Sequence, residues 1–215
     1  FIGGLILAFG FVAYVFSMYT TTVANTNFLI TTQTIFLAVF GYFFLKEKIN
    51  LITFISIILG MSGVLIILGS SLSIQSAEQF LGNIVAFIMP ISFAVLVVII
   101  RKYPNVDMVP AQFTAGIAAG IIGFFIAREI SISTHDLFLA LMAGFFQIGF
   151  GFILITVGSQ TTPAAIVGVL MLTESVFGPL WAWLFIKEVP PTAVLIGGAI
   201  IIFSILFQSF FSKTK

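Results

Sequence analysis

The sequence predicts an all-α integral membrane protein, a helical bundle with about eight visible transmembrane helices. Hydrophobic residues make up 60% of its 215 residues and charged residues only 7%. The mean hydropathy is +1.27. Soluble domains carry roughly 25% charged residues, so this chain lacks the polar side chains to cover a surface in water. Its apolar residues also fall into segments close to the ~20 residues that a helix needs to cross the hydrocarbon core.

Eight such segments follow one another along the chain, and polar or turn-forming residues separate most of them. The breaks include charged turns after residues 45 and 100, polar loops near 70–79 and 128–136, and short connections containing Pro163, Pro190 and Pro191, where helices tend to begin. We predict spans near residues 2–20, 25–45, 50–69, 80–100, 109–127, 137–157, 164–186 and 193–211.

The basic residues predict the orientation of the chain. With eight spans, both ends lie on one side, and six Lys and Arg residues fall there against two on the other. The six are Lys46, Lys48, Arg101, Lys102, Lys213 and Lys215, and the two are Arg128 and Lys187. The excess of positive charge favours cytoplasmic termini. We therefore expect a multi-pass protein of a bacterial inner (plasma) membrane, with its C-terminus in the cytoplasm.

Two stretches about 141 residues apart resemble each other. Thr32, Lys46 and Glu47 of the first correspond to Thr173, Lys187 and Glu188 of the second, and Gln33 corresponds to Glu174. The shared residues also include Thr20, Thr21, Ala24, Leu29, Phe36 and Phe44, which fall on Thr161, Thr162, Ala165, Leu170, Phe177 and Phe185. The two stretches lie in the second and seventh predicted spans, an odd offset of five, so they run in opposite directions and the repeat is inverted. Inverted repeats suit transport by alternating access, and a secondary transporter is the function we expect.

Glu174 is the acidic residue that lies deepest in a predicted span. It stands about eleven residues into its segment, or roughly 16 Å along a helix that rises 1.5 Å per residue. Such a residue costs on the order of 2.5–3.5 kcal/mol in the membrane, so we expect it to face the bundle interior or a wet cavity. We predict that Glu174 recognises substrate or carries a proton, with Gln33 and Thr173 beside it in a central polar patch. Hydrogen bonding between helices, for packing alone, is the alternative for each of them.

Two further side chains, Trp181 and Tyr14, are candidates for the walls of a substrate cavity, and Gln147 is a further candidate for substrate binding or coupling. Trp181 lies two helical turns beyond Glu174, and Tyr14 and Gln147 lie inside other spans. Each has a polar group on a large or amide side chain. A packing role is the alternative for all three.

Proline and glycine residues predict special backbone geometry within the spans. Pro90 and Pro179 each remove a helix hydrogen bond and are expected to form kinks or hinges. Gly116-x-x-x-Gly120, followed by Gly123, permits close helix approach. That motif leaves a homodimer open as an alternative.

Several functional classes lack their characteristic residues. The chain has no cysteine and a single histidine, His135, so we expect no metal site and no catalytic residues. No phosphate-binding loop is present, and a net charge of +1 argues against nucleic acid as a partner. We expect no cofactor other than a coupled proton, and as partners a small-molecule solute and membrane lipid. A structural or assembly protein without transport, and a lipid-modifying membrane enzyme, are the alternatives.

The chain resembles the drug/metabolite transporter superfamily, EamA type. The resemblance rests on Thr21-Thr-Val-Ala-Asn25, Phe44-Leu-Lys-Glu47 and Gly60-Met-Ser-Gly63, and in the second stretch on Thr162-Pro-Ala-Ala165, Thr173-Glu-Ser175, Phe185-Ile-Lys-Glu188 and Ile196-Gly-Gly198. It implies a ten-helix fold of two inverted five-helix repeats, of which residues 1–69 would be helices three to five and residues 80–211 helices six to ten.

The same resemblance, together with a start at Phe1 inside an apolar run, implies that the sequence is N-terminally incomplete. It further implies secondary transport, commonly export, of small metabolites such as amino acids or drug-like solutes. The two Lys–Glu pairs would be structural features of the membrane edge.

Overall fold

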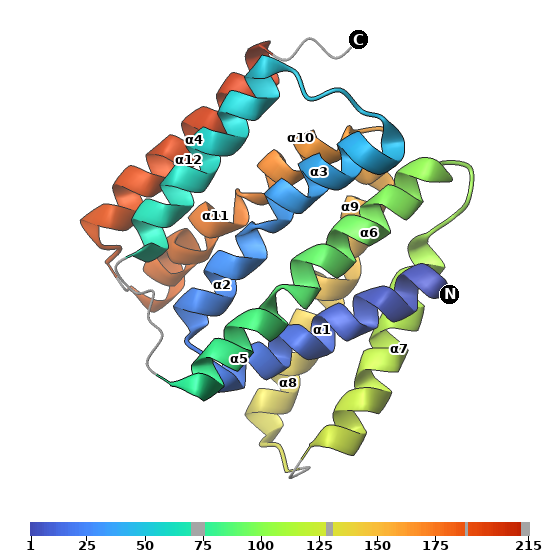
Figure 1. The fold of residues 1–215 in the computed structure, drawn as a ribbon. Coiled ribbons are helices and arrows are strands. Elements are labelled where there is room, and N and C mark those ends of the chain that lie inside the picture. Colours follow the sequence, from blue (N-terminus) through green and yellow to red (C-terminus); the bar gives the residue numbers. More distant parts are fainter. Residues whose placement is uncertain (70–75, 128–130, 188, 212–215) are drawn as a thin grey trace.

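The computed structural model describes residues 1–69, 76–127, 131–187 and 189–211, apart from the side chains of two of them. Every regular element in this part of the chain is helical (Figure 1). Eight helical spans there are long and apolar enough to cross a membrane, which confirms the predicted fold class. Arg128, Glu188, Lys213 and Lys215, which entered the sequence predictions, lie outside the described residues.

Four of the spans are single uninterrupted helices. They are α1 (Ile2–Thr20), α4 (Leu51–Leu68), α7 (Val109–Ile126) and α12 (Thr192–Phe211). Each agrees with its predicted segment to within one or two residues. A continuous apolar run without helix-breaking residues in its interior stays helical until the run ends.

The other four spans are interrupted or change their helix type along their length. The first two comprise α2 (Val23–Thr31) with α3 (Gln33–Leu45), and α5 (Ala77–Ala86) with α6 (Ile88–Lys102). The third runs through α8 (Thr134–Met142), the π-helical η2 (Ala143–Phe150) and α9 (Gly151–Ser159). The fourth runs through α10 (Ala164–Met171), α11 (Glu174–Trp181) and the π-helical η3 (Ala182–Ile186).

Polar residues define the helix ends. The Thr22 and Asn50 side chains accept hydrogen bonds from backbone N–H groups in the first turns of α2 and α4, which satisfies donors that have no partner within the helix. Lys46 follows the C-terminal end of α3, and Lys187 follows the C-terminal end of η3. Both adopt the left-handed conformation, with φ of 58° and 62°. These two lysines are about 141 residues apart. Non-glycine residues seldom adopt this conformation, so the chain leaves both helices by the same unusual turn.

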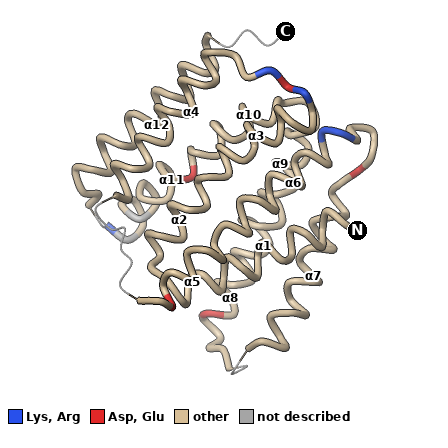
Figure 2. The backbone as a smooth tube through the Cα atoms, in the orientation of Figure 1, with Lys and Arg blue, Asp and Glu red and all other residues tan. Residues whose placement is uncertain are grey.

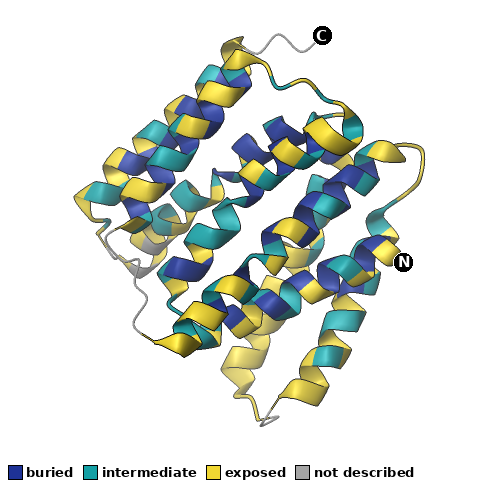
Figure 3. Cartoon of the chain, viewed as in Figure 1, coloured by how far each residue is buried: buried dark blue, intermediate teal, exposed yellow. Residues whose placement is uncertain are grey.

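Three packing arrangements hold the bundle together. The helix α1 packs against α5, α6 and α7; α3 packs against α6 and α10; and α4 packs against α12. Buried residues are frequent on α1, α4 and α6, whereas α7, α8 and η2 are largely exposed (Figure 3). The exposed residues of these outer helices are mainly apolar, such as Phe113, Phe125 and Phe145. Such a surface is suited to lipid rather than to water.

A close approach of two helices lies between α4 and α12 and depends on Gly63 and Gly197. A Cβ atom added to Gly63 would lie 2.7 Å from the Gly197 carbonyl oxygen, and one added to Gly197 would lie 2.5 Å from the Gly63 carbonyl oxygen. Hydrogen bonds flank this contact, since the buried Ser204 hydroxyl donates to the Ser56 carbonyl at 2.7 Å. Small residues with polar contacts between helices are typical of packing in membranes.

The predicted close-approach motif on α7, Gly116-x-x-x-Gly120 followed by Gly123, makes no comparable contact. Added Cβ atoms at Gly116, Gly120 and Gly123 would meet nothing within 4 Å. The motif therefore brings no other described helix close to α7. A role for it in forming a homodimer stays a prediction.

Candidate functional site

Two helix breaks at corresponding positions form the framework of the candidate site. The break between α2 and α3 lies at Thr32, and the one between α10 and α11 includes Thr173. In both, the threonine hydroxyl donates to the carbonyl three residues earlier, Thr32 to Leu29 and Thr173 to Leu170. A hydroxyl that bonds back to a nearby carbonyl competes with the helical ladder. The same local chemistry thus interrupts both helices near their middle.

The two breaks place Gln33 and Glu174 at the starts of α3 and α11. A carboxylate at this position is favoured by the partial positive charge of the helix N-terminus. Figure 2 shows acidic colour at the start of α11, whereas the other charged residues drawn lie towards the ends of the bundle. The Gln33 side chain is buried, with 4% exposed, whereas Glu174 is exposed. The acidic member of the pair is therefore the less covered of the two side chains.

Tyr14 and Thr173 lie in the neighbourhood of Glu174. Tyr14, in the middle of α1, is partly buried and close enough to Glu174 for the two groups to interact electrostatically. Thr173 precedes Glu174 and is also partly buried. The structure thus gathers three of the predicted site residues, from two helices that are far apart in the sequence.

Trp181 and Gln147 are placed at more open positions. Trp181 is 52% exposed, and its ring stacks on Phe177 with centroids 6.3 Å apart and 24° between the planes. It extends the face of α11 that begins with Glu174. Gln147 is exposed on η2, an element without buried residues.

Both predicted kink prolines lie next to changes in helix geometry. Pro90 is buried in the first turn of α6, and the break in its span falls three residues earlier, at Phe87. Proline is well tolerated in a first turn, where the backbone N–H has no helical partner. Pro179 lies inside α11, and the π-helical η3 begins three residues later. A hinge movement at either proline stays a prediction.

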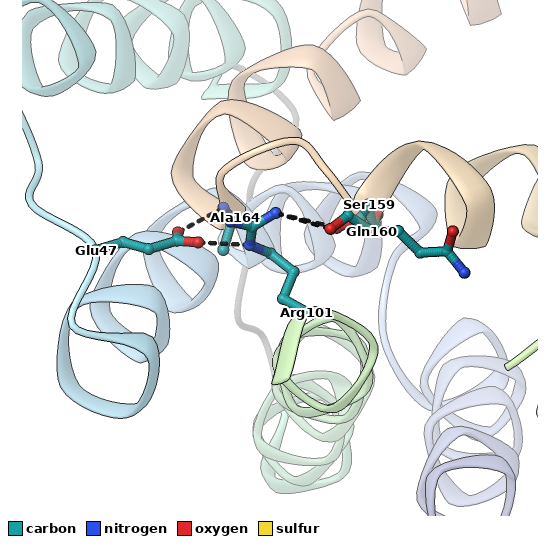
Figure 4. A network of polar contacts seen from close by, with 5 residues as sticks. All are labelled: Glu47, Arg101, Ser159, Gln160 and Ala164. Carbon is teal, nitrogen blue, oxygen red and sulfur yellow. Dashed lines mark hydrogen bonds and ion pairs between the residues drawn. The ribbon is translucent and has the colours of Figure 1, made fainter. Parts of the chain in front are cut away.

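An ionic network at one end of the bundle is the main feature that the sequence interpretation missed. Glu47 Oε1 accepts from Arg101 Nε at 2.5 Å, and Glu47 Oε2 accepts from the Ala164 backbone N–H at 2.8 Å (Figure 4). Arg101 Nη1 also donates to the carbonyls of Ser159 and Gln160, at 3.4 and 3.3 Å. Glu47 and Arg101 are largely buried, with 18% and 17% of their side chains exposed. Sequence analysis placed both at a membrane edge but had no signal that would pair them.

A second missed cluster joins α1, α2 and α5. The Asn83 side-chain oxygen Oδ1 accepts from the Thr21 hydroxyl at 2.7 Å and from the Asn25 side-chain amide at 3.2 Å. Nearby, the Ser17 and Thr26 hydroxyls form a buried hydrogen bond of 2.6 Å. These groups partner one another across helices, which is a packing arrangement.

A cavity of about 490 Å³ lies between α7 and the η2–α9 segment. Its walls are mostly apolar, and Phe11, Phe113, Ile148 and Phe152 are among them. Its polar contribution comes from Gln112, whose amide donates to the Thr156 hydroxyl at 2.9 Å. None of the predicted site residues lines this cavity.

Broken helices with polar residues at the breaks, in a bundle of eight apolar spans, define a multi-pass helical membrane protein of the transporter class. Comparison with known families agrees with this class. The EamA-like transporter family matches residues 1–69 and 80–210. The chain belongs to this family of the drug/metabolite transporter superfamily, whose members are transporters rather than enzymes.

Two known proteins illustrate the similarity. An uncharacterized transporter of Methanothermobacter thermautotrophicus is 26% identical over 181 residues, which cover 78% of this chain and 51% of the relative. The chain thus spans about half the length of that curated relative. A solved crystal structure matches with a TM-score of 0.86 and 18% identity, over 99% of this chain and 76% of the other. At that identity, the match supports the fold alone.

Proposed function

We propose that this protein is a secondary active transporter that exports small organic metabolites, such as amino acids or drug-like solutes, by alternating access between two inverted repeats. The observation that carries the proposal is the pair of corresponding helix breaks at Thr32 and Thr173, with Gln33 and Glu174 beside them. Discontinuous helices with polar groups at the bilayer midplane are where many secondary transporters bind substrate and coupling ions.

Glu174 is the residue to which we assign recognition or coupling. It stands at the start of α11, and Tyr14 lies within electrostatic reach. A carboxyl group here can pair with the ammonium group of a solute, or it can take up and release a proton as the protein changes state. Thr173 and Trp181 extend this surface along α11, and Gln33 is the counterpart of Glu174 in the first repeat.

The orientation follows from the charges at the two ends of the bundle. Lys46, Lys48, Arg101 and Lys102 gather at one end, which we call the basic end (Figure 2). An excess of Lys and Arg marks the cytoplasmic side. We therefore assign the basic end to the cytoplasm of a bacterial cell, with the protein in the inner membrane.

The test compares the parent protein with Glu174→Gln, an isosteric change that removes the titratable charge. Both are expressed at matched membrane levels, and solutes that accumulate outside the cells are measured across a range of external pH. We expect a solute that the parent exports at a pH-dependent rate and that the variant does not. The matched control is Glu78→Gln, the same substitution in the first turn of α5, and it should export like the parent.

Two results would count against the proposal in different ways. Equal export by the parent and Glu174→Gln would remove Glu174 from the mechanism while keeping transport. The absence of any transported solute, in export and in uptake, would favour a structural role in the membrane over transport.

A further inference from the structure

The two ends of the bundle differ in how the corresponding helices pack. At the basic end, α3 packs along α10, and the Thr34 hydroxyl donates to the Gly168 carbonyl at 2.9 Å. The contact is tight, because a Cβ atom added to Gly168 would lie 2.8 Å from Thr34 Cα. The elements that correspond to α3 and α10 are α11 and α2, and these two do not pack closely against each other. The basic end is therefore the closed one.

Exposure at corresponding positions shows the same difference. Ala164, at the start of α10, is fully buried, whereas Val23, at the start of α2, is 58% exposed. Gly168 is buried, and its counterpart Asn27 is exposed. The chain thus has similar sequences at both ends of the bundle but closes only one of them. Something at the basic end must favour closure there.

The Glu47–Arg101 network is a polar tie at the closed end (Figure 4). It joins the exit of α3 to three elements of the second predicted repeat: the end of α6, the end of α9 and the start of α10. Each charged group also lies near a helix terminus whose partial charge has the opposite sign. The carboxylate of Glu47 faces the N-terminus of α10, and the guanidinium group of Arg101 faces the last carbonyls around the end of α9. The start of α10 cannot move away from α3 without breaking the bond from Ala164 to Glu47.

We propose that the Glu47–Arg101 pair is a latch that holds the basic end of the bundle closed, and that the transporter must release it to open toward that side. The inference rests on the proposed transport function. It identifies a contact that is made when the basic end is closed and broken when that end is open. Charge-assisted hydrogen bonds are strong enough to bias such an equilibrium. Because the pair is still 17–18% exposed, water can reach it when it opens. Such a latch would be reversible.

Cysteine labelling tests the latch without any substrate. These 215 residues contain no cysteine, and Val167→Cys provides the reporter. Val167 is 7% exposed and packs in a core cluster with residues of α3 and α6. In lipid nanodiscs, a fluorescent maleimide should label this cysteine slowly in the parent. Adding Glu47→Gln should raise the labelling rate about tenfold, which corresponds to about 1.4 kcal/mol. The exposed neighbour Lys48 supplies the control, since Lys48→Gln should leave the rate unchanged.

A second reporter distinguishes a change of state from local loosening. Val23→Cys, at the open end, should be labelled more slowly when Glu47→Gln is added, because closing that end accompanies opening of the other. Faster labelling at both reporters would overturn the latch, since it would mean only that packing has weakened. Equal rates with and without Glu47→Gln would also overturn it.

Charge exchange guards against a variant that simply folds poorly. Glu47→Arg alone should speed labelling of Val167→Cys, and Glu47→Arg combined with Arg101→Glu should slow it again by restoring the ion pair. Recovery will be incomplete, because arginine cannot accept the hydrogen bond from Ala164. No recovery in a well-folded double variant would contradict the role of the pair. Because the labelling needs no solute, a working latch with no transported solute would count against the proposed function alone.

Discussion

The crossing of α4 and α12 is so close that one added methyl group should destabilise the fold. A Cβ atom at position 63 would lie 2.7 Å from both the Gly197 carbonyl oxygen and Ile201 Cγ1. Ile201 is fully buried. The oxygen belongs to the backbone of a long helix, so it cannot rotate away as a side chain would. We therefore predict that Gly63→Ala forces the two helices apart.

The expected cost follows from two opposing effects. Forcing an extra group into a well-packed contact costs about 1–3 kcal/mol, and rigid backbone on the facing side points to the upper part of that range. Alanine recovers about 0.5–1 kcal/mol because glycine is the poorer residue in a helix interior. The net loss for Gly63→Ala should be about 2 kcal/mol. For a chain of this size, that corresponds to a fall in Tm of about 4–8 °C.

The assay is thermal unfolding of the purified protein in one detergent, with Gly116→Ala as the matched control. Gly116 also lies inside a membrane helix, but an added Cβ atom there would meet nothing within 4 Å. The control should keep only the gain from alanine and unfold at the parent temperature or slightly above it. Gly197→Ala should resemble Gly63→Ala, and the double variant should lose less than the sum, because both methyl groups separate the same helices.

One result would refute this reasoning. If Gly63→Ala were as stable as the parent while folding normally, the two backbones could not be in contact as described. A fall of equal size in Gly116→Ala would show that the effect arises from the substitution itself rather than from the helix crossing.

Further predictions concern hydrogen bonds and the second state of the bundle. Thr34→Val should lower the free energy of unfolding by about 1 kcal/mol in the same assay, because it removes the donor to the Gly168 carbonyl; an unchanged Tm would contradict the bond. Ser204→Ala should cost a similar amount, because its fully buried hydroxyl ties α12 to α4, and a stabilising effect would argue against that tie. In the opposite state, Asn27 and Ser175 correspond to the contact that now joins α10 and α3, so a protein carrying cysteines at both positions should form a disulfide faster once the Glu47 carboxylate is neutralised. Equal cross-linking with and without that change would speak against exchange between the two ends.

The sequence by itself determined the class of protein and the places where its spans begin and end. Hydropathy and charge are local properties, and a run of about 20 apolar residues has few stable alternatives to a helix in lipid. The same is true of the correspondence between Gln33 and Glu174, which can be read by sliding the chain along itself. The turns at Lys46 and Lys187 share a sequence and share a left-handed conformation. Features that depend on interactions between residues close in the sequence could therefore be predicted from the sequence.

Only the tertiary structure decided which distant residues meet. Glu47 and Arg101 lie 54 residues apart in the sequence, with two of the eight spans between their loops, and no local pattern links them. The glycine motif on α7 looked suited to close packing, yet it faces no other described helix, whereas Gly63 and Gly197 make a tight crossing, because contact depends on which helix faces the glycine. Two similar stretches likewise gave no hint that one end of the bundle would be closed and the other open. Such differences arise from the free energy of packing between helices, which depends on the whole arrangement and not on either stretch alone.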